Sequence, residues 1–288
     1  MSELTNIASP SVWNVGILLL VINLIASYKG LKDPIFFQRY YFRVDSILIK
    51  KDYKRLLTSG FLHGSWMHLG FNMLALYSFS EMLEWRMGST YFLGIYFASL
   101  LGGSLASLYI HRNHGDYTAI GASGAVSGII FSSIALFPGI EISLLFIPIG
   151  IPGWLFGLAY VLVSINGIKS QKGNIGHDAH LGGGLIGLWA TIALYPDVLS
   201  QNPIPILLIT IPSVAFIYLI LTKPEILILG SWTNKKNYTT VDDRFNSKKK
   251  EAEVDIDRIL DKISAKGMDS LTKKEKAALD HFSGKDKD

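Results

Sequence analysis

Hydrophobic and charged positions alternate along the chain in blocks, with long apolar stretches separated by short charged segments. A helix needs roughly 20 predominantly apolar residues to cross about 30 Å of hydrocarbon, and most of the charge-free stretches are longer than that. The pattern therefore predicts an all-α polytopic membrane protein. The stretches without Asp, Glu, Lys or Arg are 4–28, 56–80, 87–111, 117–140, 142–168, 179–196 and 198–222.

These stretches predict seven membrane-spanning helices, joined by loops of differing chemistry. The loop "KGLKDPIFFQRYYFRVDSILIKKDYKRLL", after the first helix, combines basic and aromatic residues and is expected to lie in the membrane interface. The segment "GIEISLLFIPIGIPG", after the fourth helix, contains two prolines and is expected to form a second interfacial loop. The expected helices are 11–28, 63 into the polar stretch "EMLEWRMGS", 91–110, 123 to just before Pro138, 154–168, 180–195 and 204–221.

The composition changes after the last of these helices, where the chain becomes rich in charged residues. The segment "KKKEAEVDIDRILDKISAKG" has apolar residues at roughly helical spacing up to Gly267, and Thr272 with Glu275 forms a capping box that starts another helix. This tail is therefore predicted to be a small soluble helical hairpin. The expected parts of the chain are a six-helix membrane core at 1–200, an additional spanning segment with its linker at 201–230, and the charged tail at 231–288.

The composition narrows the chemistry that is available. Of the 288 residues, 49% are hydrophobic and 17% are charged. Cysteine is absent, which excludes disulfides, thiolate catalysis and cysteine-ligated metal. The isoelectric point near 9.0 reflects the basic first loop and tail, so we expect the lipid bilayer as a partner and no nucleic acid. The N-terminus shows no signal peptide, so insertion is expected to rely on the first helix.

Three polar groups stand at or near the starts of predicted helices, where burial in lipid is costly. His68 and Asn72 are four residues apart and share one helix face, while Ser123 and His180 begin the fourth and sixth helices. One interpretation is structural: serine is a favoured N-cap, and histidine is tolerated at the interface. The neighbouring glycines then allow close helix packing, in the patterns Gly124-x-x-x-Gly128 and Gly183-x-x-x-Gly187, with Gly121 just before them.

The alternative interpretation is catalytic. An adjacent imidazole is the usual activator of a serine nucleophile, and packing of the fourth and sixth helices brings Ser123 and His180 to one level. The side chains of His68 and Asn72, with backbone N–H groups near Ser123, then face a developing oxyanion. The spacing therefore predicts a nucleophile, a base and oxyanion donors from three helices.

A metal site is the competing chemistry. His63, His68, His177 and His180, with Asp178, are the available ligands, but the glutamate of a His-Glu-x-x-His helix is missing. We therefore expect no metal and no cofactor. His63 is expected to cap or orient the loop, and Asp178 to point to a different face from His180.

The motifs "HGSWMHLGFNMLALYSFS", "GASGAVSG" and "HDAHLGGGLIG", in this order and on separate helices, resemble those of the rhomboid intramembrane serine proteases. The resemblance covers roughly residues 12–195. It implies that Ser123 is the nucleophile and His180 the general base of a dyad, and that His68 and Asn72 stabilise the oxyanion. It also implies an endopeptidase whose substrate is a membrane protein with a transmembrane segment, in the bacterial inner membrane.

The sequence departs from the family pattern at several points. Members often carry an aromatic residue four positions after the serine, stacked on the histidine, whereas this chain has Ser127, which we expect to hydrogen-bond His180. The family's Trp-Arg pair is not evident in the first loop, and the seventh helix and tail are additions. The implied orientation, with the site extracytoplasmic, also places the basic first loop outside, against the positive-inside rule.

Two other functions are considered. A catalytically weak or inactive relative that serves as a membrane chaperone or scaffold shares the fold, but such proteins usually lack the serine or the histidine. A small-molecule transporter needs polar residues along a path through the midplane, whereas the polar residues of this chain cluster at helix starts. The oligomeric state is not indicated by the sequence.

Overall fold

The computed structural model describes residues 15–144, 147–170 and 175–222, and in the tail residues 259, 262–263, 268–272, 275–276 and 279. The chain forms two compact units, Met1–Lys235 and Lys236–Asp288. The start of the first predicted helix (11–14) and the linker 223–230 lie outside the described residues.

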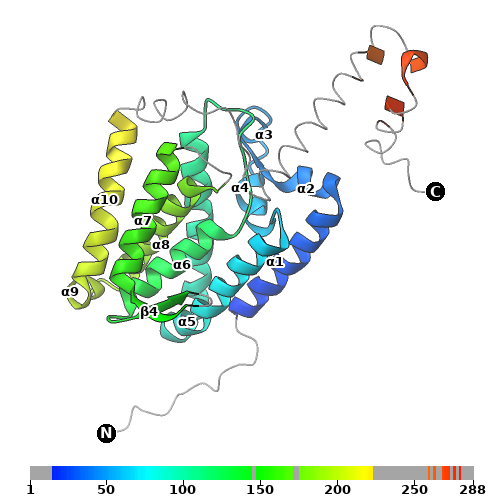
Figure 1. Ribbon diagram of the computed structural model, residues 1–288. Coiled ribbons are helices and arrows are strands. Elements are labelled where there is room, and N and C mark those ends of the chain that lie inside the picture. Colours follow the sequence, from blue (N-terminus) through cyan, green and yellow to red (C-terminus); the bar gives the residue numbers. More distant parts are fainter. Residues whose placement is uncertain are drawn as a thin grey trace. The chain divides into compact units, whose positions relative to one another are not determined.

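The first unit is a bundle of helices that run side by side (Figure 1). Each charge-free stretch contains helix, which confirms the predicted all-α polytopic membrane fold. The long helices are α1 (Val15–Lys32), α5 (Trp66–Ile110), α6 (Ser123–Leu136), α7 (Gly153–Ser170), α8 (His177–Leu194) and α10 (Pro203–Thr222). The short elements are α2 (Pro34–Tyr40), α3 (Val44–Leu48), α4 (Arg55–Thr58), the 3₁₀ helix η1 (Ser59–Phe61) and α9 (Val198–Gln201).

Three helices of the described part, α1, α5 and α10, are long and apolar enough to cross a membrane. The 45-residue α5 contains both the second and the third predicted helices, and it changes direction at Gly88, whose φ is 78° and ψ is 159°. A side chain at Gly60, before α5 begins, would collide with Leu100 near its end, so the two limbs of α5 fold back on each other. The second predicted helix begins at Trp66 rather than at His63, because Ser65 caps it by accepting a hydrogen bond from the N–H of His68.

Helix α6 lies at the centre of the bundle, and all of its residues after Ser123 are buried. Its 14 residues span only about 21 Å at 1.5 Å per residue, less than the ~30 Å of a hydrocarbon core. Neighbouring helices surround α6, so it does not have to match the thickness of the lipid.

Four of the glycines predicted for helix packing, Gly124, Gly128, Gly183 and Gly187, lie where α6 and α8 touch, whereas Gly121 lies against His68. A side chain at Gly183 would collide with the backbone of Gly124, and one at Gly187 would lie 2.6 Å from the carbonyl oxygen of Gly128. The two backbones are therefore in direct contact over about one turn, as the small-xxx-small spacing predicts.

Two small antiparallel sheets complete the first unit. Strand β1 (Phe42–Arg43) pairs with β2 (Thr118–Ala119), which ties the first loop to the segment that leads into Ser123. Strands β3 (Glu141–Leu144) and β4 (Ile147–Pro152) form a hairpin at the other end of the bundle, near α9 (Figure 1). The segment predicted as a second interfacial loop thus contains a hairpin, because its alternating residues pair as strands.

The described residues of the tail agree with a helical hairpin. Ile259 and Leu271 are buried against each other, with Ile263 and Leu279 packed beside them. Both hydrogen bonds of the predicted capping box are present: Thr272 N–H donates to Glu275 Oε2 at 2.7 Å, and Glu275 N–H to Thr272 Oγ1 at 3.3 Å. Gly267, the predicted end of the first helix, lies outside the described residues.

Candidate active site

Ser123 is the first residue of α6 and not its cap. The cap position is occupied by Ala122, which has no side chain able to accept from the first N–H groups of the helix. The structural interpretation of Ser123 as an N-cap is therefore wrong. The N–H groups at this helix start are left without a capping side chain, and they point toward the end at which the Ser123 hydroxyl lies.

Gly121 brings His68 beside Ser123. Its backbone has a φ of +115°, which favours glycine, and a side chain there would lie 2.9 Å from His68 Nε2 and 3.7 Å from Ser123 Oγ. The imidazole of His68 and the Ser123 hydroxyl therefore both lie against one glycine. Asn72 is buried one turn along from His68, and its amide nitrogen donates to the His68 carbonyl at 3.0 Å. That bond uses one of the two amide hydrogens of Asn72.

His180 lies in the first turn of α8, which begins at His177 and thus three residues before the predicted start. A side chain at Gly124 would lie 3.3 Å from the carbonyl oxygen of Ala179, so the residues next to Ser123 and to His180 are in contact across the two helices. No hydrogen bond joins the Ser123 hydroxyl to His180, both of which lie in the described part. Such bonds are often long in enzymes without substrate and tighten when the substrate binds.

His63 holds the backbone just before Ser123, as the sequence predicts. Ser27 Oγ donates to the Phe61 carbonyl at 3.0 Å, so it accepts the proton of His63 Nδ1 at 2.8 Å. With its proton on Nδ1, His63 accepts the N–H of Ala122 at Nε2, at 3.4 Å. The chain of hydrogen bonds assigns the neutral Nδ1–H tautomer to His63 and connects α1 to the start of α6.

Ser127 does not hydrogen-bond His180, so that prediction is wrong. Its hydroxyl donates to the Ser123 carbonyl at 2.7 Å, the usual bond of a helical serine to the preceding turn, and lies 2.6 Å from the hydroxyl of Tyr160. The ring of Tyr160 instead lies 6.0 Å from that of His180, at an angle of 35°. An aromatic ring is thus present beside His180, but α7 supplies it.

Asp178 faces away from His180, as expected, and anchors the loop before Ser123. The buried carboxylate lies 3.2 Å from His111 Nε2 and accepts from the Tyr117 hydroxyl at 3.3 Å. The rings of His111 and Tyr117 are stacked at 3.5 Å. Burial, and then the charge of Asp178, raise the pKa of Tyr117 well above its ordinary value, so the phenol keeps the proton that it donates.

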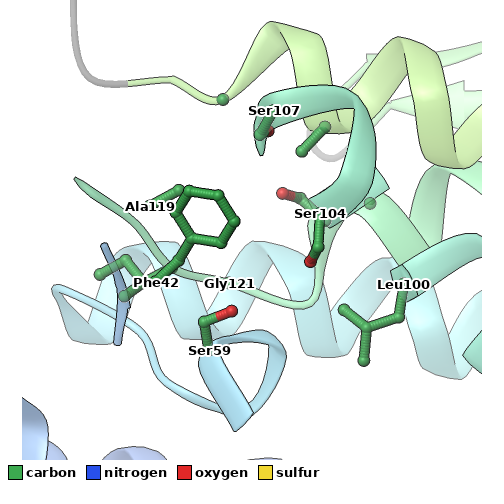
Figure 2. A pocket seen from close by; sticks show the side chains of 12 residues that line it. Phe42, Ser59, Leu100, Ser104, Ser107, Ala119 and Gly121 are labelled. Atoms are coloured by element: carbon green, nitrogen blue, oxygen red, sulfur yellow. The ribbon is translucent and has the colours of Figure 1, made fainter. Parts of the chain in front are cut away.

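A small cavity of about 30 Å³ has Ser123 among its lining residues. A cavity of roughly 10–15 Å³ of this kind is enough for one water molecule. Figure 2 shows Ser59, Ser104 and Ser107 around it, together with apolar Phe42 and Leu100. The cavity therefore combines hydroxyl groups with apolar walls next to the candidate nucleophile.

Sequence reasoning missed Tyr160, His111 and Tyr117. The residues stand outside the three motifs, and no spacing in the chain links Tyr160 on α7 to His180 on α8. Among the described residues, no group of three or more His, Cys, Asp or Glu side chains is arranged to hold a metal ion.

The short central helix, the glycine contact between α6 and α8 and the placement of the serine and histidines define an α-helical membrane bundle with a candidate serine-hydrolase site. Residues 50–197 match the Rhomboid domain, and the chain belongs to the rhomboid family. Residues 239–285 of the tail match a family of unknown function, DUF6576.

The chain is similar to several curated proteins over its rhomboid domain. It is 34% identical over 160 residues to Rhomboid protein 1, mitochondrial, of Saccharomyces cerevisiae, covering 53% of this chain and 44% of that protein. It is 33% identical to RHOMBOID-like protein 12, mitochondrial, of Arabidopsis thaliana, covering 48% and 46%. It is 34% identical to Rhomboid protease GluP of Bacillus subtilis, covering 52% and 28%. The matches thus span less than half the length of each relative.

Proposed function

We propose that this integral membrane protein is an intramembrane serine endopeptidase that cleaves a membrane protein within or beside a transmembrane segment. The observation that carries the proposal is the position of Ser123. Ser123 is the first residue of a short, buried helix, and its hydroxyl does not cap that helix. His68 lies beside the hydroxyl. The printed name of the Bacillus subtilis relative, a rhomboid protease, supports the same reaction.

The reaction proceeds through an acyl-enzyme. Ser123 Oγ attacks the scissile carbonyl while His180 takes the hydroxyl proton. His68, Asn72 and the N–H groups at the start of α6 donate to the oxyanion that forms. His180 then returns the proton to the leaving amine, and a water molecule, deprotonated by His180, attacks the ester and releases the new carboxyl group.

The reaction also requires access of water to Ser123 and local unwinding of the substrate. Water has to reach Ser123 below the membrane surface, and the cavity lined by Ser59, Ser104 and Ser107 offers polar space next to it. A peptide bond in a substrate helix is shielded by its own hydrogen bonds, so the substrate segment must unwind locally before attack. Small or helix-breaking residues near the membrane surface are therefore the proposed preference.

Labelling with a fluorophosphonate probe tests the proposal. Purified wild-type protein in detergent is expected to be labelled, and Ser123→Ala and His180→Ala are expected to lose the label. Absence of labelling in a folded wild-type protein favours the inactive chaperone or scaffold. Labelling that survives Ser123→Ala identifies a different serine as the nucleophile.

The membrane in which the protein resides, and its orientation there, are also part of the proposal. The family orientation places the candidate site and the first loop on the extracytoplasmic face of the bacterial inner membrane, although two of the relatives are named mitochondrial. The sequence lacks cysteine, so single cysteines at exposed Lys51 and Glu141 report the two ends of the bundle separately. In intact bacterial cells, an impermeant maleimide is expected to label Lys51→Cys and not Glu141→Cys. The reverse result inverts the orientation.

A further inference from the structure

Tyr160 connects the helix of the candidate nucleophile to the candidate base. The Ser127 hydroxyl donates its single proton to the Ser123 carbonyl. At the 2.6 Å contact, the Tyr160 hydroxyl is therefore the donor and Ser127 Oγ the acceptor. The other end of the Tyr160 side chain, its ring, lies 6.0 Å from the ring of His180. One side chain on α7 therefore contacts residues of both α6 and α8.

Packing holds the ring of Tyr160 in this place. Phe131 of α6 meets it edge-on, with centroids 5.5 Å apart and planes at 78°, and Phe156 of α7 lies 6.0 Å away. Phe131 itself is fully buried. Aromatic pairs at such separations are favourable beyond their buried area. The hydroxyl bond and the two rings thus fix the orientation of Tyr160 from three sides.

Within the described ranges, few other groups are placed to orient the ring of His180. The ring of His177 lies 5.9 Å from it at an angle of 73°, and Asp178 is occupied with His111 and Tyr117. A general base needs its ring held in the correct plane, because a small misplacement of a catalytic group is costly. The ring of Tyr160, inclined by only 35° to that of His180, is placed to provide this.

We propose that Tyr160 is the positioning residue for His180, and that α7 thereby supplies the aromatic support that residue 127 cannot. The role rests on the proposed function, since His180 is the base only if the chain is a serine hydrolase.

The test compares Tyr160→Phe, which keeps the ring, with Tyr160→Leu, which removes it. The control is Tyr218→Leu, the same replacement on α10 at a side chain that is 64% exposed. The measured quantity is the maximal first-order rate of fluorophosphonate labelling at saturating probe, separate from the labelled fraction at completion. A merely structural role lowers the labelled fraction, because part of the protein is unfolded. A positioning role lowers the rate.

The expected result is a loss of rate of roughly tenfold to a hundredfold for Tyr160→Leu, as for a misplaced catalytic group. Tyr160→Phe is expected to stay within about threefold of the wild type, because it loses one hydrogen bond of ordinary strength. Tyr218→Leu is expected to match the wild type. Equal rates for Tyr160→Leu and Tyr218→Leu overturn the proposal.

A rescue variant sharpens the test. The Ser127 hydroxyl points at that of Tyr160, so a ring at position 127 enters the space left when Tyr160 becomes alanine. Tyr160→Ala is expected to be slow, and the double variant Tyr160→Ala with Ser127→Phe is expected to recover most of the rate. Failure of the rescue in a folded double variant counts against the orienting role of the ring.

A second measurement separates this inference from the proposed function. Modification of His180 by diethyl pyrocarbonate, followed by mass spectrometry, needs no enzymatic activity. It is expected to be faster in Tyr160→Leu than in the wild type or in Tyr218→Leu, because the covering ring is gone. If the wild type is not labelled by the fluorophosphonate, the proposed function fails. If His180 is modified at the same rate in Tyr160→Leu as in the wild type, the contact of Tyr160 with His180 is refuted.

Discussion

Gly183→Ala tests whether the contact between α6 and α8 sets the active-site geometry. The added methyl group would collide with the backbone of Gly124 and lie 2.8 Å from the carbonyl oxygen of Ser99. Both obstacles are backbone atoms of buried helices, which cannot rotate away as a side chain can. The substitution therefore has to push α8, which carries His180, away from α6, which carries Ser123.

The size of the displacement follows from the contacts. Carbon and oxygen atoms in such contacts stay about 3.3–3.6 Å apart. Relief of the contact with the Ser99 carbonyl therefore needs a shift of roughly 0.5–0.8 Å, and relief of the closer collision with the Gly124 carbonyl needs about 1 Å or slightly more. Overpacking of this kind costs about 1–3 kcal/mol of stability. A shift of about 1 Å between catalytic groups costs up to roughly a hundredfold in rate. The expected loss of activity is thus larger than the loss of folded protein.

The assay measures the fluorophosphonate labelling rate and the thermal unfolding of Gly183→Ala together. The control is Gly94→Ala, in α5, where an added methyl group meets no atom within 4 Å. Replacement of an unhindered helical glycine by alanine is expected to leave the rate unchanged and to add about 0.5–1 kcal/mol of stability. A Gly183→Ala variant with the labelling rate and stability of the wild type refutes the reasoning.

Three further predictions concern other parts of the chain. His63→Ala leaves the N–H of Ala122 unpaired and is expected to cost about 1–3 kcal/mol in unfolding experiments. Gly88→Ala forces a side chain onto a φ of 78° and a ψ of 159°, a region that is essentially restricted to glycine, and is expected to cost about 1–3 kcal/mol, again by unfolding. The Lys262 ammonium lowers the pKa of Glu275 from 4.5 to about 2, so this pair stabilises the tail above pH 4.5 and less as the pH falls toward 2. Limited proteolysis of the tail should show this pH dependence in the wild type, and Glu275→Gln should lack it.

The all-α polytopic membrane fold was predictable from the sequence, because lipid admits few charged residues and requires backbone hydrogen bonds to close within each segment. The motifs that carry Ser123, His180, His68 and Asn72 were also recognisable, since their spacing is local to single helices. The helix starts were less accurate. Helix α5 begins at Trp66, three residues after His63, and α8 begins at His177, three residues before His180, because caps and loop contacts set these ends.

The contacts between helices were decided by the tertiary structure. The pairing of His63 with Ala122, the turn at Gly88 and the strands β3 and β4 depend on how the segments pack. Ser127 illustrates the difference: its sequence position suggested His180 as a partner, but a helical serine bonds its own preceding turn, and Tyr160 takes its remaining lone pair. Periodicity along a chain determines which face a residue occupies. Which side chain from another helix meets that face depends on the packing of the whole bundle.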